Sequence, residues 1–326
     1  MDLGWLLMTL LKILVVLLAL PVLVGFSTWA ERKVLGRMQL RYGPNRAGPF
    51  GMLQWVADAV KLITKEYVVP DGANRWLFMA APLLTLAPAL AVYALIPFGR
   101  GMAITDVNAG ILTLVAVSSL TIYGIIFGGW ASNSKYSMLG ALRSASQMIS
   151  YELSLGLALV AVVLMAGTMS LVGIVEAQRT VPFAALQPLG FLIFVVAGIA
   201  ETNRTPFDLP EAEGELGAGY HTEYSAMGFG VFQLGEYASI WSMSALAATL
   251  FLGGWQGPWV AAVPALSLVW FLAKSALFVF LFYWLRGTLP RMRQDQLMAF
   301  GWKFLLPLAI LNLLWAAAVT AWRAQP

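Results

Sequence analysis

Cysteine is absent from this 326-residue sequence, and histidine occurs only once, as His221. The absence of thiols excludes disulfides and thiolate-held iron–sulfur clusters, and a single imidazole excludes any metal site that needs two. The glycine-rich segments GxGxxG and GxxxxGK(S/T), which bind dinucleotides and phosphates, are also missing. We therefore expect that this chain holds no redox cofactor and no metal of its own.

Charge is scarce as well. Charged residues make up 11% of the chain, hydrophobic residues make up 60%, and the mean hydropathy is +0.77, whereas soluble domains carry roughly 25% charged residues. A helix needs about 20 apolar residues to cross a bilayer. The sequence therefore predicts an all-α, polytopic membrane protein that forms one transmembrane domain over residues 1–326, with about eight spans, at about 3–29, 76–98, 108–130, 144–167, 182–200, 228–252, 260–284 and 302–321.

The basic residues predict the orientation of these spans. Fifteen Lys and Arg residues fall in the loops 31–75, 131–143, 201–227 and 285–303, and only Arg100, Arg179 and Arg323 fall in the connections on the other side. Positive charge collects on the cytoplasmic side of membrane proteins. We expect the four basic loops in the cytoplasm and both chain termini on the opposite side.

Residues 51–67 predict an amphipathic helix within the first cytoplasmic loop. At 100° per residue Gln54, Asp58, Lys61 and Lys65 share a narrow sector, while Val56, Val60, Ile63 and other apolar residues lie opposite. Such a helix can rest in the membrane interface or close an opening between spans. Periodicity does not separate these alternatives from a surface helix with no further role.

Three ionisable residues fall deep within predicted spans, namely Glu152, Glu236 and Lys274. A charge near the bilayer centre costs roughly 2.5–3.5 kcal/mol on insertion scales, so such groups are paired or line a wet cavity. One interpretation is a buried polar path for protons or ions, because their pKa values respond to neighbouring charges. The other is static contact between helices, in which Lys274 neutralises one glutamate.

The cytoplasmic loop 201–227 is strongly acidic, with only Arg204 as a cation against Glu201, Asp208, Glu211, Glu213, Glu215 and Glu223. Glu211 and Glu215 share a face if this segment is helical, and carboxylates that close together raise one another's pKa. The loop therefore predicts proton uptake near neutral pH. The alternative is an ordinary solvated acidic loop.

Four long segments together resemble one family. They are AERKVLGRMQLRYGPNRAGPFGMLQWVADAVKLITKE at 30–66, SASQMISYELSLGL at 144–157, AETNRTPFDLPEAEGELGAGYHTEYS at 200–225 and RGTLPRMRQDQLMAFGWKFLLPL at 286–308. In this order they resemble the H subunits of proton-pumping NADH:quinone oxidoreductase, respiratory complex I. The resemblance covers nearly the whole chain, and the form of the acidic loop is similar to that of bacterial members, which implies a bacterial inner membrane with both termini in the periplasm.

The resemblance implies a substrate, partners and residue roles. The substrate is a quinone, either ubiquinone or menaquinone, and the partners are soluble iron–sulfur subunits at the quinone site, small membrane subunits, antiporter-like subunits and membrane lipid. By position in the motifs, the residues that belong to the quinone cavity are Arg32, Asp58, Arg204, Phe207 and Asp208. Those that belong to the proton-coupling path are Glu152, Glu201, Glu211, Glu213, Glu215, Glu223 and Glu236, and the same motifs suggest roles for Glu31 and Lys274.

Other functions remain open at the level of sequence. The nearest is a homologous membrane subunit of an energy-converting hydrogenase or of a ferredoxin- or F420-linked oxidoreductase, which differs in its electron donor. A standalone ion transporter fits the buried Glu and Lys residues, although no inverted repeat is detectable. A passive scaffold for soluble subunits leaves the charges within the membrane unexplained.

Overall fold

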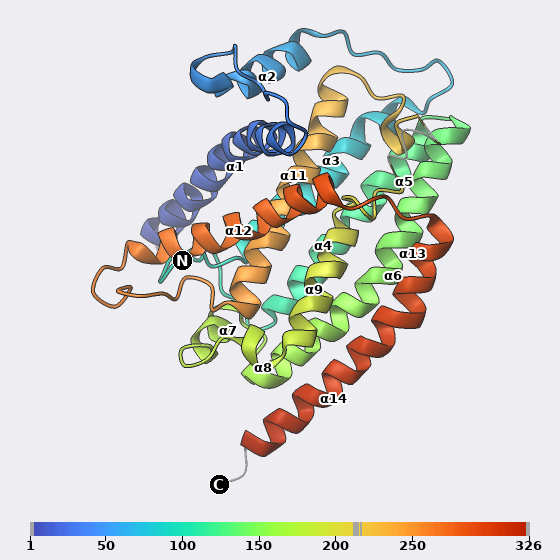
Figure 1. Cartoon of the computed structure of the whole chain (residues 1–326). Helices are drawn as coiled ribbons and strands as arrows, with labels where there is room; N and C mark the ends of the chain where they lie inside the picture. Colours follow the sequence, from blue (N-terminus) through green and yellow to red (C-terminus); the bar gives the residue numbers. More distant parts are fainter. Residues whose placement is uncertain (1–2, 211–214, 216, 324–326) are drawn as a thin grey trace.

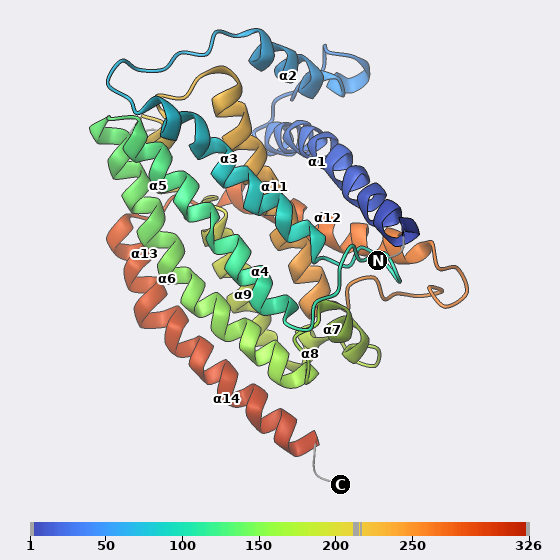
Figure 2. The same ribbon diagram turned by 180° about the vertical axis from the view of Figure 1, so that it is seen from behind.

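The computed structural model describes residues 3–210, 215 and 217–323. In this part of the chain every regular element is a helix, which confirms the all-α membrane fold (Figures 1 and 2). The elements are α1 Leu3–Met38, η1 Pro49–Gly51, α2 Gln54–Thr64, α3 Arg75–Ala91, η2 Val92–Ala94, α4 Gly110–Ser119, α5 Thr121–Ala131, α6 Lys135–Ala166, α7 Leu171–Ala177, α8 Phe183–Leu186, α9 Pro188–Glu201, η3 Gly219–His221, α11 Ala226–Phe251, α12 Leu266–Thr288, α13 Gln294–Phe300, η4 Gly301–Leu305 and α14 Leu306–Arg323.

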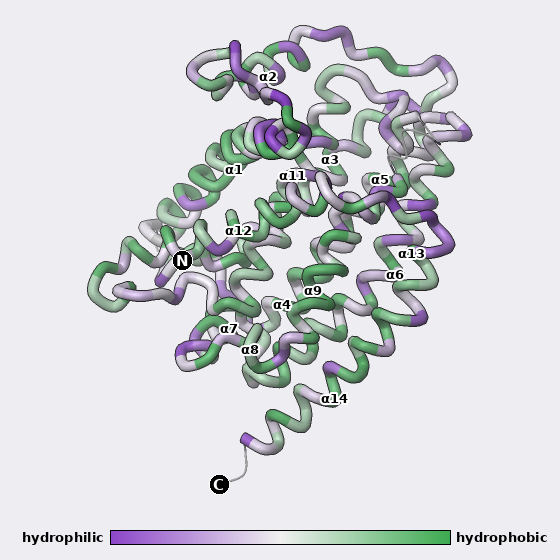
Figure 3. The backbone as a smooth tube through the Cα atoms, in the orientation of Figure 1, coloured by the Kyte–Doolittle hydropathy of each residue, from purple (hydrophilic) through white to green (hydrophobic). Residues whose placement is uncertain are grey.

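Six helical stretches of the described residues are long and apolar enough to cross a membrane, which makes the chain a multi-pass membrane protein. They are Leu6–Met38, Arg75–Ala94, Gly110–Ala131, Lys135–Ala166, Leu266–Thr288 and Gln294–Arg323. Each overlaps one of the expected spans. Figure 3 shows apolar residues along these helices, while hydrophilic residues gather around α2 at the upper end of the molecule and around α13 at its right-hand side.

The two other expected spans have a different character. Residues 182–200 form the short helices α8 and α9, and α9 has only 14 residues, or about 21 Å of helix against a hydrocarbon core of roughly 30 Å. The segment 228–252 forms α11, which is long enough, yet its Ser, Thr, Gly and Glu residues keep it out of the apolar set. The number of eight spans stays a prediction.

Small residues bring the central helices into close contact. A Cβ at Gly124 of α5 would overlap the hydroxyl of Thr85 on α3, and a Cβ at Gly129 would overlap the side chain of Ala141 on α6. Packing with such small side chains is how helices associate when lipid surrounds them. A larger apolar cluster, which includes Tyr151, fills the space between α6, α9, α11 and α12.

The first two helices stand at the edge of this bundle (Figure 1). α1 exposes most of its Leu and Val side chains and buries only a few of them, among them Leu20 and Val24. α2 crosses the C-terminal half of α1, where the ring of Trp55 lies so close to Gly25 that a Cβ there would be 2.6 Å from it. Phe26 packs on the same ring, with centroids 5.6 Å apart.

Candidate functional site

The loop that follows α9 lies among the helices rather than on the surface. Gln147 of α6 is fully buried, and its Nε2 donates to the backbone oxygens of Ala200 and Phe207, each at 2.7 Å, and to the side-chain oxygen of Asn203 at 3.2 Å. Gln147 lies twelve residues after Lys135, about 18 Å along the helix. The loop therefore reaches the depth of the bundle, where irregular backbone is tolerated only when protein encloses it.

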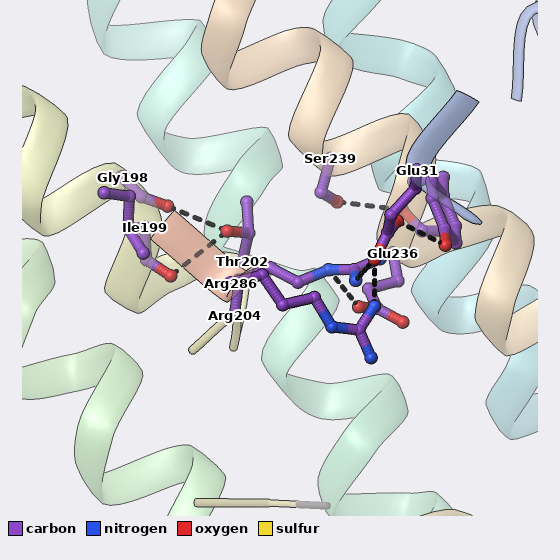
Figure 4. A network of polar contacts seen from close by, with 10 residues as sticks. Glu31, Gly198, Ile199, Thr202, Arg204, Glu236, Ser239 and Arg286 are labelled. Atoms are coloured by element: carbon purple, nitrogen blue, oxygen red, sulfur yellow. Dashed lines mark hydrogen bonds and ion pairs between the residues drawn. The ribbon is translucent and has the colours of Figure 1, made fainter. Parts of the chain in front are cut away.

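Arg204, in this loop, joins two distant helices through one buried and one partly buried carboxylate (Figure 4). Its Nη1 lies 3.0 Å from Oε1 of Glu31 on α1, and its Nε lies 2.7 Å from Oε1 of Glu236 on α11. The side chain of Arg204 is 6% exposed and that of Glu31 only 2%. A planar guanidinium can serve two carboxylates at once, which the ammonium of a lysine does less well.

Two further residues complete this network. Arg286 of α12 donates to the same oxygen of Glu31, and the Tyr237 hydroxyl donates to the second oxygen at 2.7 Å. The guanidinium of Arg204 also lies 4.6 Å from the centre of the Tyr237 ring. Two carboxylates and two guanidiniums balance in charge, so each of these ions has a partner of opposite sign. We call Glu31, Arg204, Glu236, Tyr237 and Arg286 the arginine network.

Phe207 and Asp208 continue the loop away from Arg204. Phe207 is buried against the rings of Tyr151 and Phe300, with centroids at 5.3 and 6.5 Å. Arg291 donates to the backbone oxygen of Asp208. Burial raises the pKa of the Asp208 carboxyl to about 6, and the positive charge of Arg291 only partly offsets this effect.

Asp208 is therefore expected to titrate close to physiological pH. Because burial raises its pKa in the folded protein from the usual 3.8 to about 6, the cost of burying its charge is absent below about pH 4, grows as the pH rises from about 4 to about 6, and is complete above that. The infrared difference spectrum between the wild-type complex and the Asp208→Asn complex should contain a band of a protonated carboxyl group. As the pH is raised, this band should lose its intensity with a midpoint at about pH 6. The exposed Asp71→Asn is the control, and the absence of such a band from the Asp208→Asn difference would refute the assignment.

Two cavities, each with a volume of about 30 Å³, lie next to Glu201, and one of them is also lined by Glu236 of the arginine network. That volume holds about two water molecules when polar groups line it. The cavities share four polar side chains, those of Thr121, Glu201, Thr202 and Ser239. One cavity is also lined by Glu236, Asn203 and Tyr220. The other extends along Ser118 and Ser242. Glu201 is thus the carboxylate that lines both.

Glu152, on α6, lies near Glu201 at the end of α9. The Ser119 hydroxyl at the end of α4 donates to its carboxylate, and Glu152 is within electrostatic reach of Glu201. The structure therefore brings together Glu31, Glu236, Glu201 and Glu152, which come from four different helices. Hydroxyl groups and space for water lie between Glu236 and Glu201.

Arg32 and Asp58 form a second, more exposed contact where α1 meets α2. Arg32 Nη1 lies 2.7 Å from Oδ2 of Asp58, and Gln54 Nε2 donates to the other carboxylate oxygen at 3.0 Å. The two charged side chains are 47% and 33% exposed. The polar side of α2 therefore faces α1, immediately beside the position of Glu31.

The other residues that the sequence suggested lie elsewhere. Lys274 is apart from the carboxylates, and its Nζ donates to the backbone oxygens of Leu252, Gly254 and Gln256 at 2.6, 3.0 and 2.6 Å, at and just beyond the end of α11. This arrangement replaces the expected neutralisation of a glutamate. Glu223 is half-buried just before α11.

The acidic loop departs from expectation at Glu215. Its carboxylate lies 2.6 Å from Nη1 of Arg143 on α6, and this hydrogen bond and charge lower the pKa of Glu215. The expectation of a raised pKa is wrong at this position, because Arg143 from another helix lowers the pKa of Glu215 more than burial raises it. Glu211 and Glu213 lie outside the described residues.

Sequence reasoning misses three residues of this site, namely Gln147, Tyr237 and Arg286. In the sequence Arg286 is only one of several cytoplasmic cations, and Tyr237 gives no signal among other aromatic residues. Gln147 carries a usable signal, because an amide inside an apolar span must find hydrogen-bond partners. It lies in the segment 144–157, one of the four that carry the family resemblance.

Comparison with known proteins places the chain among described relatives. A family model described as NADH dehydrogenase matches residues 11–317. The chain is 52% identical over 323 residues to an H subunit of NADH-quinone oxidoreductase, the one numbered 2, of Syntrophobacter fumaroxidans, covering 96% of each protein. It is 54% identical over 313 residues to the H subunit of NADH-quinone oxidoreductase of Rhodospirillum centenum, covering 94% of this chain and 92% of the relative.

Proposed function

The chain belongs to the NADH dehydrogenase family, among the H subunits of NADH-quinone oxidoreductase, and on this premise we propose that it forms part of a quinone cavity and couples quinone reduction to proton translocation. It is a multi-pass membrane subunit of that enzyme complex, and the other subunits of the complex are its partners. The substrate of the proposed cavity is a quinone, ubiquinone or menaquinone.

We assign Arg32, Asp58, Arg204, Phe207 and Asp208 to this cavity. The observation that carries the proposal is the arginine network, in which Arg204 ties the loop after α9 to α1 and to α11. Such a concentration of buried charge needs a purpose beyond stability, because apolar residues of similar size hold helices together at least as well. A charge change beside Arg204 acts on both carboxylates at once.

The coupling step follows from electrostatics. Reduction of the quinone to the quinol takes two electrons from the partner subunits and two protons from the surrounding protein. Two unit charges 8 Å apart interact by roughly 2 kcal/mol at an effective dielectric near 20, which exceeds one pKa unit. In this proposal the change passes from the arginine network through Glu236 and Glu201 to Glu152, with water in the two cavities as the carrier between Glu236 and Glu201.

The acidic loop supplies protons in this proposal. Glu211, Glu213 and Glu223 take them up from the cytoplasm, and Glu215 anchors the loop to Arg143 of α6. This assignment places the loop in the cytoplasm of a bacterium and both termini in the periplasm, as the distribution of Lys and Arg predicts. The partners are then soluble iron–sulfur subunits on the loop side, and small and antiporter-like membrane subunits on the Glu152 side, with membrane lipid around the outer helices.

The alternatives fare less well. Relatives that match over almost the whole chain carry the name of the H subunit of NADH-quinone oxidoreductase, which favours NADH as the electron source over a hydrogenase or ferredoxin system. A subunit of a complex is also not expected to exchange ions in isolation. The passive scaffold gives no reason for the carboxylates between the helices.

Asp58→Asn tests the quinone cavity, with Asp71→Asn in the same loop as control. The exposed pair with Arg32 is worth at most about 1 kcal/mol, so we expect the KM for quinone to rise up to about fivefold in the purified complex. NADH oxidation by a soluble artificial acceptor should stay at the wild-type rate. An unchanged KM and unchanged inhibitor sensitivity would remove Asp58 from the cavity.

A further inference from the structure

α2 exposes an apolar stripe that no part of the described chain covers. Val60 and Ile63 are 54% and 67% exposed, and Leu53 and Val56 lie on the same side of the helix. The opposite side carries Gln54, Trp55, Asp58 and Leu62 and faces α1 and α11. The helix thus turns its most apolar residues away from the protein.

The position of α2 along α1 fixes its depth. α1 exposes a continuous row of aliphatic side chains from Leu6 to Val22, which is the surface of a helix in hydrocarbon. α2 packs just beyond this row, with Trp55 at Gly25 and Phe26 and with Asp58 at Arg32. The stripe therefore lies at the level where α1 leaves the hydrocarbon and enters the polar headgroup region.

Most of the charged side chains exposed on and next to α2 are positive, and Glu66, beside Lys65, is an exposed carboxylate. Lys61 and Lys65 are exposed on α2 and at its end, and Arg37, Arg41 and Arg46 are exposed in the preceding segment. Asp58, the carboxylate of α2, is turned inward to Arg32. Lys61 and Lys65 lie on the polar side of the helix. Lysines on the polar side of a helix that carries an aliphatic stripe are typical of a membrane surface, whereas the cores of protein interfaces are rich in aromatic residues and poor in lysine.

We propose that α2 is a binding site for anionic phospholipid of the cytoplasmic leaflet. Leu53, Val56, Val60 and Ile63 contact the upper acyl chains, and Lys61 and Lys65 hold the headgroup phosphates. The site rests on the proposed lipid contact and on the cytoplasmic placement of the loop, and it is independent of the quinone cavity. Phosphatidylglycerol serves as the probe.

A photoreactive amino acid at Val60 in the assembled complex tests what covers the stripe. After illumination of the complex in membranes, mass spectrometry should find phospholipid attached at residue 60. The same amino acid at the inward-facing Leu62 is the matched control and should react within the protein. Attachment of residue 60 to another subunit, or no attachment of lipid, would overturn the proposal.

The headgroup assignment has a separate test. The complex carrying Lys61→Gln and Lys65→Gln is reconstituted with phosphatidylcholine and a minor fraction of phosphatidylglycerol, and the lipid attached at residue 60 is quantified. An anionic surface attracts each lysine enough to change the local preference by about fivefold, so the phosphatidylglycerol share should fall by at least that factor. Arg100→Gln with Arg179→Gln, at the opposite end of the molecule, should leave it unchanged. An equal share in the lysine variant would overturn the headgroup contact.

Neither test depends on quinone chemistry. If Asp58→Asn leaves the KM for quinone unchanged while residue 60 attaches to phosphatidylglycerol, the assignment of Asp58 to the quinone cavity fails and the lipid site stands. If Asp58→Asn raises the KM for quinone while residue 60 attaches to no phospholipid, the lipid site fails and the quinone cavity stands.

Discussion

Replacement of Arg204 by methionine is expected to abolish inhibitor-sensitive quinone reduction and to reduce the yield of assembled complex strongly. The change leaves Glu236 and Glu31 with Arg286 alone, and removing one partner of a buried ion pair costs about 3–5 kcal/mol. Arg204→Lys keeps the charge but loses the planar fork that reaches both carboxylates. It should assemble and reduce quinone at well below the wild-type rate. Quinone reductase activity per assembled complex is the measurement, with NADH oxidation by a soluble acceptor as the measure of assembly.

A second substitution separates charge imbalance from loss of shape. Arg204→Met with Glu236→Gln restores the charge balance of the arginine network, so it should recover assembly without recovering quinone reduction. Arg179→Met is the control, because Arg179 forms an exposed pair with Glu176 and such pairs contribute little. Wild-type quinone reduction in Arg204→Met would show that the network has no part in the reaction.

Apolar length and helical periodicity carry most of the fold. The six long apolar helices follow from runs of hydrophobic residues, and α2 follows from the spacing of Gln54, Asp58, Val56 and Val60, which a short-range periodicity can show. The short α9 does not follow, because whether a helix ends early depends on tertiary contacts such as those of Gln147. The sequence therefore places the loop after α9 at the membrane surface, whereas hydrogen bonds from α6 hold it within the bundle.

The site is only partly visible in the sequence for a related reason. A glutamate inside an apolar span indicates that it has a partner, but the sequence does not show which residue that partner is. Glu236 pairs with Arg204, while Lys274, the most obvious candidate, donates to backbone carbonyl groups at and just beyond the C-terminal end of α11. Arg286 pairs with Glu31, although the two residues are 255 positions apart in the sequence. Pairings of this kind are set by how helices cross, and a single sequence does not record the crossing.

Glu201→Gln is expected to abolish proton translocation and to slow quinone reduction at least about tenfold, since positioned proton-transfer groups contribute roughly 10²–10⁴-fold. Glu201 lines both cavities, so an amide there interrupts any proton path between Glu236 and Glu152 while keeping the shape of the side chain. The measurement is acidification of proteoliposomes per NADH oxidised, together with the rate of quinone reduction in the presence of a protonophore.

Three comparisons decide what a loss in Glu201→Gln means. Glu201→Asp keeps an ionisable group one methylene further from the cavities and should retain part of the translocation. Glu176→Gln changes an exposed glutamate on α7 and should behave as the wild type. If Glu201→Gln translocates protons with the wild-type yield, protons do not pass through these cavities and coupling proceeds without Glu201. If it loses translocation but reduces quinone at the full rate with a protonophore present, Glu201 belongs to the proton path and not to the quinone chemistry, because the arginine network then still responds to the quinone on its own.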